Sequence, residues 1–102
     1  MSKIQKRISF NHFNAIAGIF NGLAHPIRLE ILSILEEGEY FMVGDILNKL
    51  KIDPTLLSHH LSKMKNLGIL ESFREGRNVY YRLATTEIIQ IFHCIDNCRM
   101  KM

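Results

Sequence analysis

The fold is decided by residues 53–83, which read DPTLLSHHLSKMKNLGILESFREGRNVYYRL. The Asp53-Pro54 pair is typical of a helix start, because aspartate caps the first turn and proline suits the first helical position. Leucine and methionine then recur at helical spacing until Gly68, a residue type that commonly ends a helix. Beyond Gly68 the pattern changes to two β-branched or aromatic runs. The stretch therefore predicts a helix over residues 54–67 followed directly by a β-hairpin.

The predicted hairpin consists of residues 69–73 and 78–83. Between the two runs, Glu75-Gly76 suits a tight turn. Such a turn places Arg74 and Arg77 on either side of the hairpin tip. The hairpin is therefore expected to present basic charge at its exposed end.

Three further helices are expected upstream of this stretch. The first, over residues 9–21, carries an apolar stripe at helical spacing and is expected to stop at Gly22. The second begins at His25-Pro26 and ends near Gly38. It is apolar almost all round, as expected of the central core helix. The third, over residues 43–51, is apolar on one face.

A last helix is predicted over residues 85–98, where isoleucine is frequent. The chain has 102 residues, enough for one domain and too few for two. The order of elements predicts a mainly α fold with a small β-hairpin, a winged helix-turn-helix of five helices plus a wing. Within a single domain of residues 1–102, we assign residues 42–67 to the helix-turn-helix and residues 69–83 to the wing.

Basic charge is concentrated in the second half of this predicted domain. The net charge is only +3, but residues 49–82 carry seven lysines and arginines against three acidic residues. Between Asp53 and Glu71 there is no acidic residue at all. A basic surface of this kind, on the helix before the wing, indicates contact with a polyanion.

In a winged helix-turn-helix, the second helix of the pair enters the major groove of DNA and the wing contacts the flanking backbone. Hydroxyl and imidazole groups suit base edges or phosphates, and lysine and arginine reach phosphates. We therefore expect the DNA-binding residues to be Thr55, Leu56, Ser58, His59, His60, Ser62, Lys63, Lys65, Arg74 and Arg77.

The sequence resembles the ArsR/SmtB family of bacterial transcriptional repressors over about residues 20–83. The matching stretches are LAHPIRLEIL (23–32), LSHHLSKM (57–64), GIL (68–70) and REGRNVYYRL (74–83). The resemblance implies a repressor that binds a palindromic operator in double-stranded DNA as a homodimer. It also implies that the first and last helices, residues 9–22 and 85–98, form the dimer interface.

Many members of this family release DNA when a metal ion binds, but the familiar ligand positions are poorly matched here. Met42 and Gly44 stand where one site has thiolate ligands. A second site pairs ligands early and late in the last helix. His93 and Asp96 show the later spacing, whereas Tyr80 and Arg82 occupy the earlier positions.

The remaining candidate sensor groups are His93, Cys94 and Cys98. Thiolate and imidazole suit zinc or copper(I), and a partner subunit would have to complete the site. The two thiols are equally suited to redox sensing. A third interpretation is that Cys94 simply packs in the dimer interface. No cofactor is required, and zinc or copper(I) would bind only under the first interpretation.

Other function classes receive little support. No Ser-His-Asp, Cys-His or paired-carboxylate arrangement and no glycine-rich phosphate loop stands out, so we expect no enzymatic activity. Residues 8–27 lack Lys, Arg, Asp and Glu but are interrupted by polar side chains, so no membrane span is expected. Two cysteines fit a reducing cytoplasm. The alternative function is a winged helix used only for protein–protein contact.

Overall fold

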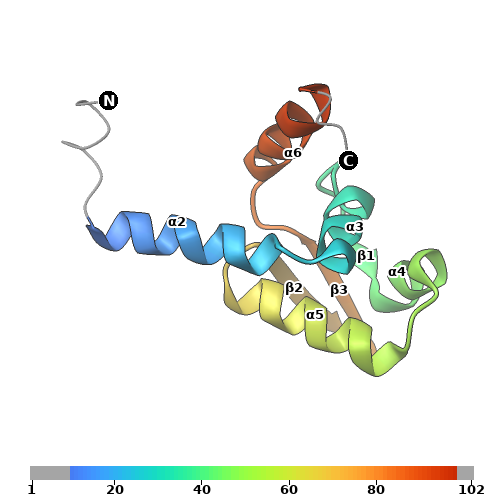
Figure 1. Ribbon diagram of the computed structural model, residues 1–102. Coiled ribbons are helices and arrows are strands. Elements are labelled where there is room, and N and C mark those ends of the chain that lie inside the picture. The colour runs from blue at the N-terminus through green and yellow to red at the C-terminus, as the bar shows by residue number, and fades with distance from the viewer. Residues whose placement is uncertain (1–9, 99–102) are drawn as a thin grey trace.

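The computed structural model describes residues 10–98, and Figure 1 shows their arrangement. The elements follow one another as α2 (Phe10–Leu23), α3 (Pro26–Ile34), β1 (Phe41–Met42), α4 (Val43–Leu50), α5 (Pro54–Asn66), β2 (Leu70–Glu75), β3 (Asn78–Leu83) and α6 (Glu87–Asn97). The predicted start of the first helix at residue 9 lies outside the described residues.

The two proline-marked helix starts are confirmed. Asp53 is the N-cap of α5, and its Oδ2 accepts hydrogen bonds from the backbone N–H groups of Thr55 (2.9 Å) and Leu56 (3.2 Å). His25 caps α3 in the same way, with its Nδ1 accepting from the N–H of Ile27 at 3.2 Å. Each cap satisfies N–H groups that a helix start leaves without intrahelical partners.

Three predicted boundaries were wrong. Gly22 does not end the first helix: α2 continues to Leu23, and Gly22 is buried, with the side chain of Leu67 where a Cβ would lie. The second helix ends at Ile34, before the predicted end at Glu37-Gly38, and a turn leads to Gly38, whose φ of +84° favours glycine. The hairpin turn is Gly76-Arg77, one residue later than expected, with φ of +63° at Gly76.

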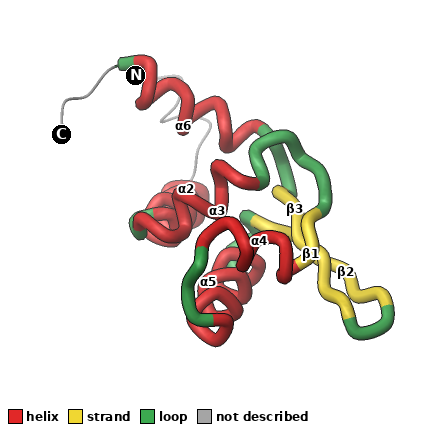
Figure 2. The backbone as a smooth tube through the Cα atoms, turned by 90° about the vertical axis from the view of Figure 1, so that its right-hand side faces the viewer, coloured by secondary structure: helices red, strands yellow, loops and turns green. Residues whose placement is uncertain are grey.

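The wing is part of a three-stranded antiparallel sheet of order β1-β3-β2. β2 and β3 pair from Leu70 with Leu83 to Glu75 with Asn78. The two residues of β1 pair with the far side of β3, a strand that the sequence pattern did not indicate. In Figure 2 the hairpin projects from the body of the molecule, with its turn at the outer end.

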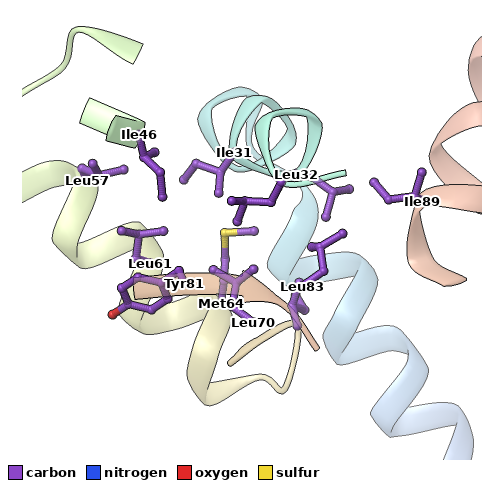
Figure 3. Packing of buried hydrophobic residues seen from close by; sticks show 12 residues of the cluster. Ile31, Leu32, Ile46, Leu57, Leu61, Met64, Leu70, Tyr81, Leu83 and Ile89 are labelled. Atoms are coloured by element: carbon purple, nitrogen blue, oxygen red, sulfur yellow. The ribbon is translucent and has the colours of Figure 1, made fainter. Parts of the chain in front are cut away.

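The core lies where α3, α4 and α5 meet the sheet (Figure 3). The second predicted helix is central to it, since its Ile31, Leu32 and the following Leu35 are fully buried. The other buried apolar side chains are Ile46, Leu57, Leu61, Met64, Ile69, Leu70, Tyr81, Leu83 and Ile89. α5 is therefore held by its inner face, which leaves its opposite face at the surface.

Candidate nucleic-acid interface

The outward face of α5 consists of the side chains that the helix period places opposite its core residues. Leu57, Leu61 and Met64 are buried against the rest of the domain. Nine of the ten predicted DNA-binding residues are exposed, seven of them on α5 and two on the wing: Thr55, Leu56, Ser58, His59, Ser62, Lys63, Lys65, Arg74 and Arg77. The N-terminus of α5 adds no free N–H group to this surface, because Asp53 accepts from Thr55 and Leu56 and Pro54 has no N–H.

The prediction for His60 was wrong. Its side chain is only 3% exposed and packs against the ring of His25, with the ring centroids 4.5 Å apart. Its Nδ1 accepts a hydrogen bond from Nε of Arg28 at 3.0 Å. A buried imidazole cannot reach a base edge, so His60 contributes to helix packing and not to the surface of α5.

The sequence contained a signal for this burial. His60 lies three residues after Leu57 and four before Met64, which places it on the buried stripe of the helix. The helical spacing alone assigns His60 to the core, whereas the polarity of its imidazole favoured the surface.

The wing carries two exposed arginines, one beside α5 and one in its turn. Arg77 lies in the exposed turn, and Arg74 lies on β2 opposite Val79. Arg74 also lines a groove between α5 and the sheet, together with Ser58, Ser62 and Lys65 of α5. None of the described residues that line this groove is acidic. The groove therefore joins the exposed faces of the helix and the wing into one basic surface.

The other face of the wing sheet is chemically different. The ring of Tyr80 stacks on Phe73 with centroids 4.8 Å apart, and Tyr40 meets Phe73 edge-on. Nε of Arg82 donates to Oε1 of Glu71 at 2.6 Å, and this hydrogen bond raises the pKa of Arg82. Because Glu71 neutralises it, Arg82 adds little to the positive potential of the wing.

A second surface is formed by the two helices at the ends of the described chain. α2 and α6 flank an apolar groove. Its lining includes Ile16, Phe20, Leu29, Ile91 and Ile95, all large apolar side chains that remain substantially exposed. Exposed apolar patches of this kind mark interaction sites.

The candidate sensor groups lie on α6 but do not form a preassembled metal site. Cys94 and Cys98 are free thiols and are exposed. Nε2 of His93 lies 2.9 Å from Oε2 of Glu36, so its nearest polar partner is a carboxylate and not a thiol. Within residues 10–98, no group of three or more His, Cys, Asp or Glu side chains is placed to hold a metal ion.

Comparison with known proteins places this architecture in a family. Residues 25–72, which cover α3 to the start of the wing, match the model of the bacterial regulatory protein, arsR family. The biofilm growth-associated repressor of Xylella fastidiosa is 32% identical over 82 residues, a match that covers 80% of this chain and 71% of that protein. The chain belongs to the ArsR family.

Solved structures agree with an ArsR-family winged helix. The transcriptional repressor BigR from Xylella fastidiosa superposes with a TM-score of 0.79 and 27% identity, covering 99% of this chain and 97% of that one. A winged helix-turn-helix DNA-binding domain from Mycobacterium bovis, described as homodimeric, gives a TM-score of 0.73 and 29% identity over 85% of this chain and 80% of its own. The predicted fold class is confirmed.

Membership of the ArsR family also settles the broad class of function. The protein is a transcriptional regulator and not an enzyme, as the sequence analysis predicted. No helix within residues 10–98 is both long and apolar enough to cross a membrane. The individual DNA-contacting residues stay predictions.

Proposed function

We propose that this ArsR-family regulator represses transcription in the cytoplasm by binding a palindromic operator as a homodimer. The observation that carries the proposal is the basic surface shared by α5 and the wing. It combines an exposed helix face without acidic side chains with Arg74, which lines the groove between α5 and the sheet, and with the exposed Arg77 in the wing turn. Phosphates and base edges of a duplex match this chemistry.

The dimer is proposed from the groove between α2 and α6. Its exposed isoleucine and phenylalanine side chains need a covering surface, and the same groove on a second copy supplies one by two-fold symmetry. Two recognition helices, one from each subunit, would then enter successive major grooves about 34 Å apart. Bound in this way, the dimer would block access of the polymerase to a promoter.

Arg77→Ala is expected to weaken binding to all duplex sequences and to flatten the dependence of affinity on salt. Arg77 lies in the wing turn, where its guanidinium is free to meet phosphates. Each lost phosphate contact lowers the log–log salt slope by about 1, so a dimer with two wings should lose about 2. Fluorescence anisotropy with a promoter-region duplex over a salt series measures this directly.

Arg82→Ala is the matched control on the same hairpin. Its guanidinium is already paired with Glu71 on the other face of the sheet, so its removal should leave the salt slope near the wild-type value. An unchanged salt slope in Arg77→Ala would show that the wing does not contact DNA.

Ser58→Ala should behave differently from both and alter which sequence is preferred, because a hydroxyl on α5 reads base edges.

The effector part of the proposal rests on Cys94 and Cys98. Both thiols are exposed and lie one helical turn apart, beside His93. We expect oxidation to release DNA more readily than zinc or copper(I), because each chain offers only two thiols and a metal site would need ligands from both subunits.

Anisotropy of the protein–DNA complex with and without reductant, and with each metal ion added, tests this expectation. Release by oxidant that Cys94→Ser abolishes would assign the cysteines as a redox sensor. Release by a metal ion that the same variant abolishes would assign a shared metal site instead. Indifference to all of these additions would make the cysteines structural.

A further inference from the structure

The buried imidazole of His60 lies at the meeting point of three helices. Its ring packs beside His25, the residue that caps α3. Arg28 of α3 donates from Nε to Nδ1 of His60 at 3.0 Å and from Nη1 to the backbone oxygen of Gly22 at 2.9 Å. One guanidinium therefore joins the end of α2, the start of α3 and the middle of α5.

The hydrogen bond exists in only one protonation state of His60. Because Nδ1 accepts from Arg28, the neutral ring carries its proton on Nε2. That Nε2 is buried and has no hydrogen-bond partner among the described residues. A second proton would have to go to Nδ1, where it would face the N–H of a permanently charged guanidinium.

The surroundings of His60 oppose its positive charge. Burial lowers its pKa below the ordinary value of 6.5, and the nearby His25, Arg28 and His59 lower it further. Lys63, one turn later on α5, is also basic. Protonation of His60 is therefore unfavourable while the three helices are joined.

Acidic groups on the elements that pack against His60 do not stabilise its protonated form. Glu30 lies two residues after Arg28, on a different side of α3. On β2, which packs on α5, Glu71 is paired with Arg82 on the outer face of the sheet. α2 carries no Lys, Arg, Asp or Glu, and its His12 lies ten residues before Gly22, about 15 Å along the helix.

We propose that the Arg28–His60 hydrogen bond is a pH-sensitive joint that holds the DNA-reading helix α5 in its binding position, and that acidification opens it. The inference rests on the proposed function, because α5 is the helix assigned to the major groove. It adds a pH signal to that function, and this signal is separate from any signal sensed by the cysteines of α6.

The direction of the effect follows from proton linkage. Well above pH 6.5 His60 is neutral whether the joint is closed or open, so its protonation does not change operator affinity there. Below 6.5 the open form takes up a proton that the closed form resists, and the closed form loses population. This loss continues until the pH falls below the lowered pKa of the closed form.

His60→Asn tests the joint, because the amide oxygen of asparagine can still accept from Arg28 but does not titrate. Affinity for a promoter-region duplex is measured between pH 5.5 and 8 at constant ionic strength. We expect the wild type to weaken several-fold on acidification relative to His60→Asn. His93→Asn, which removes a histidine from α6, should keep the wild-type ratio of affinities. Equal ratios in the wild type and His60→Asn would overturn the proposal.

A measurement on the wild type alone covers the case in which His60→Asn does not fold. The imidazole resonances of His60 in an NMR titration should move with a midpoint below 6.5, together with the Nε–H resonance of Arg28. A midpoint at or above 6.5, or an Arg28 resonance that does not follow, would refute the joint. Because this titration needs no DNA, it separates failure of the joint from failure of the proposed function, which would appear as no duplex binding at any pH.

Discussion

Ile91→Glu is expected to convert the protein to a monomer and to weaken operator binding by about 100-fold or more. Ile91 is 46% exposed on α6 and lines the apolar groove between α2 and α6. In the proposed dimer the glutamate would be buried without a partner, at a cost of several kcal/mol. Each 1.4 kcal/mol is a tenfold change in an equilibrium constant, so dimerisation should be lost at micromolar concentration.

Sedimentation velocity gives the oligomeric state, and anisotropy gives the affinity for a palindromic duplex. Gln90→Glu is the matched control, because it adds the same charge to the preceding residue of α6, outside the lining of the groove. We expect the control to remain dimeric. If Ile91→Glu sediments as the wild type does and binds with the same affinity, the groove is not the dimer interface.

Leu57→Ala is expected to destabilise the fold by about 2–5 kcal/mol, the usual cost of truncating a buried leucine to alanine. Leu57 is fully buried and lies in the cluster that holds α5 against the core. For a domain of this size the melting temperature should fall by roughly 10 °C or more. Thermal unfolding followed by circular dichroism measures the change.

Leu56→Ala is the neighbouring control. Leu56 is 41% exposed on the outward face of α5, so its truncation should change stability by no more than about 0.5 kcal/mol. Its effect should appear in DNA affinity instead. Equal melting temperatures for the two variants would mean that the inner and outer faces of α5 have been assigned wrongly.

The elements that the sequence predicted best are those with local causes. The starts of α3 and α5 depend on a cap and a proline that are adjacent in the chain, so His25-Pro26 and Asp53-Pro54 marked them correctly. The hairpin was predicted from a change of period and a glycine in its turn. Its exact turn was missed by one residue, because the register also depends on the pairing along the strands.

The features that were missed depend on contacts between distant residues. At Gly22, which lies within α2, the side chain of Leu67, 45 positions later, occupies the space that a Cβ would take. β1 is two residues long and exists through its pairing with β3, so it has no pattern of its own. The pairing of Arg82 with Glu71, which removes Arg82 from the basic surface, follows from strand register and could not be deduced from composition.

Binding of the intact chain to a duplex from its own upstream region, followed by anisotropy over a salt series, tests the central claim most directly. We expect binding by two chains per duplex that weakens steeply as salt is raised, because lysine and arginine side chains of α5 and the wing displace counterions from phosphates. Absence of binding at every salt concentration would contradict it. The winged helix would then act as a protein-contact module.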